Sequence, residues 1–360
     1  MKRDTIIYNK GLNLFAISTA IMGIILIVAG ATVTSTGSGD SVPDWPLSYG
    51  SLTPPMIGGI LYEHSHRLIA GFTALMIAIL AFWVWKKDNR QGVRLLALIV
   101  LGGVILQAAL GGLRVLVVST ESVQDVVAGM TSESKIETVR ILITATHAIL
   151  AQSIICVLVA ISVLTSKSWI NSKYFNGARD TGVFAFRISL ALLSLVFIQL
   201  IMGTLVRHTG AGTIIPDFPL SFGQIIPPFG NLPNNIQAAF PISQDELAFK
   251  VAIQFLHRFL AFVIFGFVLY TYIYFRKAGY FKNLKQLLLF LVCLQIVIGA
   301  LNIWTKNSVF VTVSHVVIGA IILASCVVLV LWSWRFVNEN VKSENTDRII
   351  QETSPIADSV

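Results

Sequence analysis

Four histidines occupy repeated positions inside apolar stretches of this 360-residue chain. His66 and His147 lie in its first half, and His257 and His315 lie at equivalent places in its second half. Ionisable side chains are costly inside a membrane and are usually functional there. Two imidazoles that face each other from neighbouring helices suit the two axial positions of a haem iron. We therefore interpret the four histidines as two pairs of iron ligands.

Two other interpretations of these histidines stay open. A buried histidine can hydrogen-bond to a backbone carbonyl, and this is how a lone histidine would be interpreted. Zinc is the rival metal, but a zinc site normally needs three or four protein ligands. Only Glu63 stands where it could add a ligand to the first pair. The repetition of both pairs at matched depth favours haem.

Glu63 breaks the repeat. It stands three residues before His66, one helical turn away and on the same face. The corresponding residue before His257 is Gln254, a neutral side chain of nearly the same shape. Because only the carboxyl group can exchange a proton, the first half is predicted to carry out chemistry and the second only to hold a cofactor. The alternative is that Glu63 simply marks the aqueous end of its helix.

Two arginines directly follow ligand histidines. Arg67 and Arg258 could pair with acidic groups of a bound cofactor, or their long side chains could extend to the membrane surface. We count both among the cofactor-binding residues, with the two options open.

The two remaining histidines lack this symmetry. His64 points roughly 200° around the helix from His66, and we expect it to form hydrogen bonds at the membrane interface. His208 corresponds to Ser35 in the first half. It is therefore expected to be structural, or to make a polar contact near the second site.

The elements that must position these residues are membrane spans. The chain is 55% hydrophobic and 12% charged, with a mean hydropathy of +0.77, whereas soluble proteins carry roughly a quarter charged residues. This composition excludes a disordered chain and argues against a soluble enzyme. Eight stretches approach or exceed the ~20 apolar residues that cross a bilayer. They are 12–34, 60–85, 94–118, 139–165, 183–206, 249–275, 286–304 and 309–334.

The charges predict how the chain is oriented. Eight spans put both termini on one side, and that side holds 18 of the 26 Lys and Arg residues. The positive-inside rule therefore places both termini in the cytoplasm. The net charge of +8 lies in short clusters between spans, which argues against nucleic-acid binding. The polar tail after Arg335 is expected to be disordered.

Internal repetition defines the architecture. The loop after the first span reads TGSGDSVPDWPLSYGSLTPP, and the loop after the fifth reads TGAGTIIPDFPLSFGQIIPP, identical at more than half of the aligned positions. Each half holds four spans, so the halves share one orientation. We predict an all-α integral membrane protein of two pseudo-symmetric four-helix bundles. The halves are residues 1–175 and 176–337, followed by a cytoplasmic tail at 338–360.

The paired loops have a stiff aromatic centre. Pro43 to Pro46 and Pro216 to Pro219 are expected to fold over the outer mouths of the bundles and cover the haem edges. An aromatic belt at the membrane interface is the alternative. The segments 119–138 and 229–248 are unmatched between the halves, and no chemistry is assigned to them. Three cysteines, Cys156, Cys293 and Cys326, are interpreted as small hydrophobic side chains.

With these residues identified, the chain resembles the haem A synthases. The resemblance covers roughly residues 10–335 and rests on the eight spans and the two similar halves. It also rests on the E-x-x-H-R stretch from Glu63 to Arg67, and on His147, His257–Arg258 and His315. The combination is specific, although each element alone would be weak.

The resemblance implies a reaction and its cofactors. A methyl group of haem O would be oxidised to a formyl group through hydroxylated intermediates, which gives haem A for cytochrome oxidase. The first half, with His66 and His147, would bind the substrate haem, and the second half, with His257 and His315, would hold a permanent haem b. Glu63 would take the position of the family's essential carboxylate.

The first outer loop departs from many bacterial members of the family. Those members have a cysteine pair there, whereas residues 35–59 contain none. The chain therefore looks more like the cysteine-free branch, which includes the mitochondrial forms. Its short basic N-terminus does not resemble a transit peptide, so a multi-pass protein of a bacterial cytoplasmic membrane is expected.

Two further functions and several partners follow as expectations. A di-haem membrane cytochrome b that transfers electrons, and a haem carrier without catalysis, are the alternatives to a haem-modifying oxidoreductase. The asymmetry between Glu63 and Gln254 favours the oxidoreductase. The expected partners are membrane lipid, haem O and an electron acceptor, with haem O synthase and a second copy of the chain as further candidates.

Overall fold

Eight long helices dominate the computed structural model, which describes residues 7–119, 136–171, 179–232, 236, 240, 242–277 and 281–353. The long helices are α1 (Lys10–Ser35), α2 (Gly58–Lys87), α3 (Gln91–Ser119), α5 (Ile136–Leu164), α7 (Arg179–His208), α9 (Gln244–Lys277), α10 (Lys282–Trp304) and α11 (Val309–Thr353). All eight are long and apolar enough to cross a membrane. The predicted all-α membrane fold and its eight spans are confirmed.

Shorter elements connect these helices. The described short elements are η1 (Ser38–Asp40), α6 (Lys167–Asn171) and η3 (Ala211–Thr213). Most of the unmatched segment 119–138 lies outside the described residues, as do 233–235, 237–239 and 241 in the segment 229–248.

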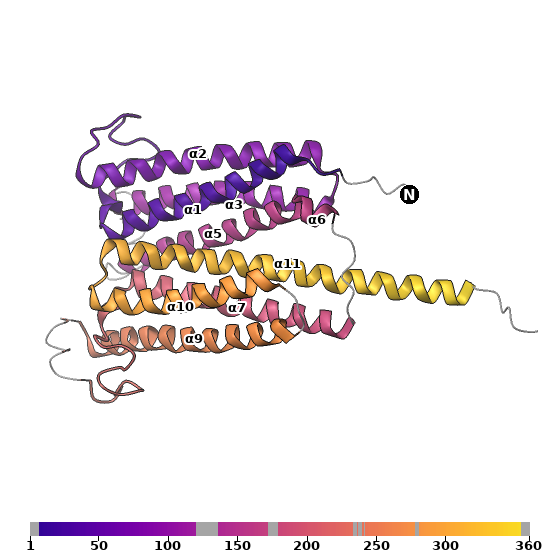
Figure 1. Ribbon diagram of the computed structural model, residues 1–360. Helices are drawn as coiled ribbons and strands as arrows, with labels where there is room; N and C mark the ends of the chain where they lie inside the picture. Colours follow the sequence, from indigo (N-terminus) through magenta and orange to yellow (C-terminus); the bar gives the residue numbers. More distant parts are fainter. Residues whose placement is uncertain are drawn as a thin grey trace, which may run out of the picture.

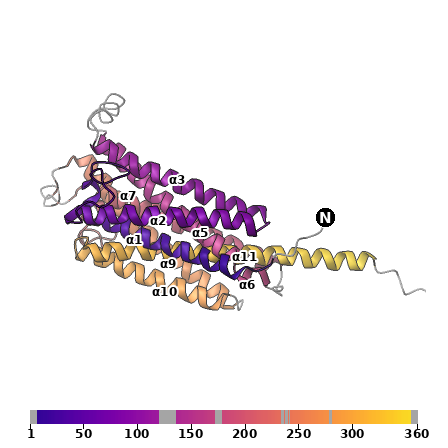
Figure 2. The ribbon, with the colours of Figure 1, turned by 90° about the horizontal axis from the view of Figure 1, so that it is seen from above.

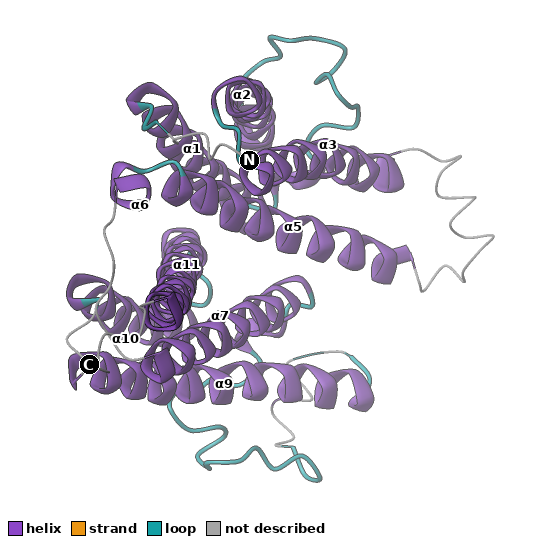
Figure 3. Cartoon of the chain, turned by 90° about the vertical axis from the view of Figure 1, so that its right-hand side faces the viewer, coloured by secondary structure: helices purple, strands orange, loops and turns teal. Residues whose placement is uncertain are grey.

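The contacts between helices fall into two groups, which lie side by side in Figure 3. In the first group, α1 contacts α2 and α5, and α3 contacts the same two helices. In the second group, α7 contacts α9 and α11, and α10 contacts the same two helices. The groups meet where α11 lies against α1 and α5, and where α5 lies against α7. Seen from above, α3 and α10 lie on opposite sides of the assembly (Figure 2).

Both repeated loops begin with the same helix ending. Gly37 follows α1 with φ 66°, and Gly210 follows α7 with φ 70°. Glycine adopts this left-handed conformation without a steric penalty, which is why it commonly ends helices. The Thr-Gly pair at the start of each repeat therefore stops the helix and turns the chain into the loop.

The two loops lie at the same end of the molecule, which we call the loop end (Figure 1). The start of α1 and the far end of α11 both lie at the opposite end (Figure 1). This agrees with an even number of spans. The location of that opposite end in the cytoplasm stays a prediction.

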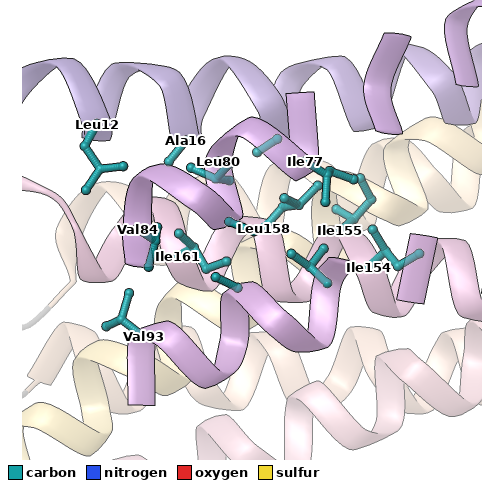
Figure 4. Close-up of a cluster of buried hydrophobic side chains, with 14 of the residues drawn as sticks. Leu12, Ala16, Ile77, Leu80, Val84, Val93, Ile154, Ile155, Leu158 and Ile161 are labelled. Atoms are coloured by element: carbon teal, nitrogen blue, oxygen red, sulfur yellow. The ribbon is translucent and has the colours of Figure 1, made fainter. Parts of the chain in front are cut away.

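The core of the first group is a cluster of aliphatic side chains. Its labelled members are Leu12, Ala16, Ile77, Leu80, Val84, Val93, Ile154, Ile155, Leu158 and Ile161, which point toward one another from four helices (Figure 4). Ala320 of α11 joins this cluster and links the two groups. In lipid, such contacts stabilise by close fit, because the surrounding acyl chains are equally apolar. Cys156, Cys293 and Cys326 are free thiols on α5, α10 and α11.

The end of α11 corrects one expectation. We predicted disorder after Arg335, but the helix continues to Thr353 and extends beyond the other helices (Figure 1). The reason lies in the sequence itself. Between Arg335 and Thr353 there is neither glycine nor proline, and several Glu, Lys and Arg residues favour a helix. The first proline after the span is Pro355.

Leu158→Ala tests the importance of the first core. Leu158 is fully buried, so truncation leaves a cavity and should lower the free energy of unfolding by about 2 kcal/mol, near the low end for such changes. Denaturant unfolding of the purified protein in detergent would measure this. The matched control is Leu98→Ala, because Leu98 is 48% exposed on the same group of helices. Equal effects of the two substitutions would contradict the assignment of the core.

Candidate functional site

Each of the four repeated histidines lies against a glycine of a neighbouring helix. A Cβ atom on that glycine would stand only 3.0 to 3.3 Å from the imidazole Cε1 atom. The four contacts are Gly30 with His66, Gly111 with His147, Gly203 with His257 and Gly299 with His315. The rings therefore occupy the space that any larger residue would need. The structure thus places the predicted histidines at four equivalent positions. We call each contact between such a histidine ring and its glycine a histidine seat.

Gly111 and Gly299 each stand four residues after a glutamine, Gln107 and Gln295, so the repeat between the halves reveals them. Gly30 and Gly203 share no such repeated glutamine and were missed. Both missed glycines stand seven residues before the glycine that ends their helix. Extending the repeat alignment back from Gly37 and Gly210 into the helices would have found them.

Three glutamines fix the backbone at the level of the histidines. Gln107 donates to the carbonyl oxygen of His147 at 3.0 Å, and Gln295 donates to that of His315 at 2.9 Å. A third glutamine, Gln199, donates to the carbonyl oxygen of His257 at 3.0 Å. Its counterpart in the first half is Leu26, an apolar side chain that cannot donate. The carbonyl of His66 therefore has no glutamine at the equivalent position to donate to it, unlike the carbonyls of the other three histidines.

The imidazole rings of the second pair are spaced as two ligands of one metal would be. The ring centroids of His257 and His315 are 6.4 Å apart, with an interplanar angle of 65°. Two imidazoles bound to one metal by bonds of ~2.0–2.1 Å would have centroids roughly 6 Å apart. The Nδ1 atoms of all four histidines are buried and have no hydrogen-bond partner among the described residues.

Glu63 is buried one helical turn before His66, and both of its carboxylate oxygens accept hydrogen bonds. Its Oε2 atom accepts a hydrogen bond from the backbone N–H of Val42 at 3.0 Å. Its Oε1 atom accepts from the Nη2 atom of Arg67 at 2.7 Å. Gln254 holds the equivalent backbone N–H, that of Ile215, at 2.7 Å. Both side chains thus bind the outer loop to the helix that carries the histidine.

The change from carboxylate to amide alters one further contact. Gln254 donates to the carbonyl oxygen of Gly212 at 2.7 Å, which an ionised carboxylate could not do. In the first half, the equivalent carbonyl of Gly39 accepts from the Nη1 atom of Arg114 at 2.6 Å. In the first half, where Glu63 stands in place of a glutamine, Arg114 therefore donates the hydrogen bond to this carbonyl.

Arg67 and Arg258 hold the loops rather than extending to the membrane surface. The Nη1 atom of Arg67 donates to the carbonyls of Asp44 and Leu47 at 2.6 and 2.5 Å. Arg258 donates likewise to Asp217 at 2.7 Å and Leu220 at 3.1 Å. Each arginine thus fastens the Pro-Asp-aromatic-Pro-Leu stretch to the helix that carries the neighbouring histidine. A direct role toward cofactor carboxylates stays a prediction.

The repeated loop motif folds as a tight turn. Tyr49 and Gly50 have φ of 53° and 68°, and the backbone of Ser48 pairs with that of Ser51. Two successive positive φ values are typical of the type I′ hairpin turn, whose second position favours glycine. The carboxylate of Asp44 accepts both turn N–H groups, each at 2.7 Å.

The second loop repeats this turn with Asp217. Its carboxylate accepts the N–H groups of Phe222 and Gly223, each at 2.8 Å. Partial burial is the largest single influence and raises the pKa of Asp217. The two turn N–H groups and the nearby Arg258 together outweigh it, so the pKa lies below the ordinary value. The pKa of Asp44 is lowered in the same way, against the same effect of burial.

The other predicted loop contacts are confirmed in part. His64 is buried, with Nδ1 at 2.8 Å from the hydroxyl of Ser48 and Nε2 at 3.1 Å from the carbonyl oxygen of Leu52. The expectation of a hydrogen-bonding role for His64 is thus confirmed. The ring of Trp45 lies against Gly112, beside the glycine that seats His147. The first loop therefore reaches the helix face next to the first pair, while covering of a haem edge stays a prediction.

Asp217→Asn tests the role of the turn carboxylate. A carboxylate with a lowered pKa stabilises the fold above its unfolded pKa, and this contribution is lost as pH falls through the folded pKa. The substitution should lower the thermal unfolding temperature in detergent at about pH 7, and this loss should shrink as the pH falls below about 4, the ordinary aspartate pKa. A loss that stays constant as the protein is acidified would show that the charge of Asp217 is not involved.

Gly203→Val tests the histidine seat. The valine side chain would displace the imidazole of His257, because even a Cβ atom comes within 3.0 Å of it. We expect the second pair to lose most of its haem, measured as Soret absorbance per protein. Gly102→Val is the matched control, since nothing lies within 4 Å of a Cβ atom there. Normal haem content in the Gly203 variant would contradict the proposed seat.

Known proteins resemble this chain over most of its length. Haem A synthase of Halalkalibacterium halodurans is 25% identical over 331 residues, which cover 90% of this chain and 97% of that protein. Haem A synthase of Listeria welshimeri is 27% identical, with 88% and 93% covered. That of Staphylococcus haemolyticus is 26% identical, with 84% and 88% covered. With the eight apolar helices, these relatives indicate a multi-pass protein of a bacterial membrane.

The family assignment rests on a match that includes all four histidines. Residues 59–327 match the model of the COX15-CtaA family, described as cytochrome oxidase assembly protein. This range holds Glu63 and both histidine pairs, and it covers well over half of the chain. The chain therefore belongs to the COX15-CtaA family of cytochrome oxidase assembly proteins.

Proposed function

We propose that this protein is a haem A synthase, which oxidises a methyl group of haem O to a formyl group and so supplies haem A to cytochrome oxidase. The family match and the haem A synthases among its relatives support this function. The observation that carries it in the structure is the pair of equivalent histidine seats, of which only one has a carboxylate beside it.

The histidine pairs suit haem better than a bare metal ion. In the described part of the chain, no group of three or more His, Cys, Asp or Glu side chains could hold a metal ion. Zinc would need such a group. A haem iron brings four equatorial nitrogens of its own and needs only axial ligands from the protein. Two imidazoles seated on glycines, with unpartnered Nδ1 atoms, meet that need.

The two halves take different roles in this proposal. His66 and His147 bind haem O, and His257 and His315 bind a permanent haem b. Each set of four helices is a bundle around one haem, with the boundaries 1–175 and 176–337. Both termini and the tail at 338–360 lie in the cytoplasm, as the basic residues predict. The cysteine-free branch of the family remains the expected one.

In this proposal, Val42 and Arg67 hold the negatively charged carboxylate of Glu63 beside the substrate. Haem O supplies the iron and the methyl group that becomes formyl. The N–H of Val42 and the guanidinium of Arg67 hold the two oxygens of Glu63 in place. A carboxylate fixed in this way can accept a proton released during oxidation, or stabilise positive charge that develops on the substrate. Gln254 can do neither, so the second half only holds its cofactor.

The two alternatives are less well supported. An electron-transferring cytochrome b has no need for a proton-exchanging group at one haem only. A haem carrier would not need an ion-paired carboxylate buried beside one pair. The electron acceptor, haem O synthase and a second copy of the chain remain candidate partners.

Haem extraction tests the function directly. Purified protein should contain haem b together with haem O, hydroxylated haem or haem A, separated by chromatography and identified by mass. Haem O added to the protein should be converted. Haem b alone in both sites, unchanged when haem O is supplied, would rule out a synthase.

Glu63→Gln tests the role of the carboxylate. The variant should keep its haem but lose product formation by about 10²-fold or more, the usual scale for a proton-transferring group. Glu246→Gln is the matched control: it makes the same change in another i,i+4 ion pair, with Lys250 at 2.8 Å, but Glu246 is exposed. Haem A formation at the normal rate in the Glu63 variant would refute its catalytic role.

A further inference from the structure

A basic cavity lies at the loop end, between the two groups of helices. Its volume is about 320 Å³, and its lining comes from α1, α3, α5 and α7 and from the loop that holds η1. Three arginines line it, Arg114, Arg140 and Arg207, together with His208. The only carboxylate among the lining residues is that of Asp40. Among the described lining residues, basic side chains therefore outnumber acidic ones.

Asp40 neutralises part of this charge. Its Oδ1 atom accepts from Arg114 at 3.0 Å, and its Oδ2 atom accepts from Arg140 at 3.1 Å. In the part of the lining that the structure describes, three guanidinium groups thus accompany one carboxylate. This set of donors favours an anionic ligand, since arginine donates in pairs to carboxylates.

Arg207 reaches into this cavity from the second group. Its Nη2 atom donates to the carbonyl of Ala31 at 2.8 Å and to the hydroxyl of Ser35 at 2.6 Å, both on α1. Its Nη1 atom is buried and has no hydrogen-bond partner among the described residues. A buried, charged donor without a partner is unfavourable unless a ligand satisfies it.

The cavity stands one helical turn from the histidines. Val33 and Thr34 follow Gly30 by three and four residues on α1, and Arg114 follows Gly111 by three on α3. Residues spaced in this way share one face of a helix. On α5, Thr144 precedes His147 by three residues on the same side. Three helices thus lead from the level of the first histidine pair to the lining of the cavity.

The second half has no equivalent concentration of charge. By the repeat, Arg114 corresponds to Asn302 and Arg140 to Ser308. Nine of the eleven lining residues come from the first half, and only Arg207 and His208 come from the second. The basic cavity therefore belongs mainly to the first histidine pair, with the second half adding one arginine.

We propose that this cavity binds the propionate carboxylates of the haem held between His66 and His147, with Arg207 contributed across the interface of the two halves. This inference rests on the proposed function for the identity of the ligand. A cavity of this size accommodates the acidic edge of a porphyrin but not the whole ring. The haem is thereby oriented with its propionates toward the loop end, and the first site is complete only when the second half is docked.

The test compares haem b with its dimethyl ester, which keeps the ring but lacks both carboxylates. Each probe is titrated into haem-depleted, full-length protein in detergent, and the Soret band gives the dissociation constant. A His257→Ala background restricts binding to the first pair, and a His66→Ala background restricts it to the second. A two-site fit in the unsubstituted protein gives the same constants if either background variant does not fold.

Arg207→Gln should raise the dissociation constant for haem b at the first pair about ten-fold, the scale of one lost charged hydrogen bond. It should leave the dissociation constant for the dimethyl ester unchanged. Arg90→Gln is the matched control, because it makes the same change in an arginine that pairs with Asp88 at the opposite end of the molecule. It should change neither constant.

Three results would overturn the inference. One is equal binding of haem b and its ester by the unsubstituted protein, which would mean that the cavity holds some other anion. Another is an equal loss for both probes in the Arg207 variant, which would indicate a purely structural role. The third is a loss confined to the second pair. Haem binding through propionates without haem A formation would instead refute the proposed function and leave this inference standing.

Discussion

The contact between an imidazole ring and a glycine of the neighbouring helix is the constraint on which this structure depends. Lipid provides no hydrophobic force between helices, so their spacing follows from side chains that fit closely. At each of the four histidines, the ring takes the place of a side chain on the adjacent helix. The distance between helices and the position of the ring are therefore set by the same contact. At three of the four histidines, a glutamine also donates a hydrogen bond to the backbone carbonyl and so fixes the position of the helix.

The loops at one end depend on the same helices. Arg67 and Arg258 follow His66 and His257 in the sequence, and their guanidinium groups donate to carbonyls of the loop turns. Glu63 and Gln254 hold the start of each loop from the same helices. A helix that positions one of these histidines thus also positions the loop next to it. A carboxylate at position 63 preserves this arrangement of the loop, because Arg114 donates to the carbonyl of Gly39. In the second half, the amide of Gln254 donates to the equivalent carbonyl.

The two halves share one architecture but differ in their charged residues. The elements that hold a histidine pair are repeated, while the charged residues around the pairs are not. Glu63, Arg114 and Arg140 are found only in the first half, and Arg207 only in the second. The duplicated architecture supplies two similar sites, and a few charged substitutions make them chemically different. Arg114, Arg140 and Arg207 meet in one cavity, where α7 of the second group lies against α5 of the first.

The sequence by itself determined the spans, the repeat and the four histidines, together with the asymmetry of Glu63. Length and apolar composition are enough to identify membrane helices, and repetition reveals equivalent positions without any structure. Only the tertiary structure decided what the side chains contact. Residues far apart in the chain meet in three places. Arg67 donates to loop carbonyls, Gly30 and Gly203 pack against histidine rings, and Arg114 and Arg207 line one cavity. Such contacts depend on how helices pack, which hydropathy does not encode. The extension of α11 was missed for a different reason, because a polar composition was taken for disorder where no residue breaks the helix.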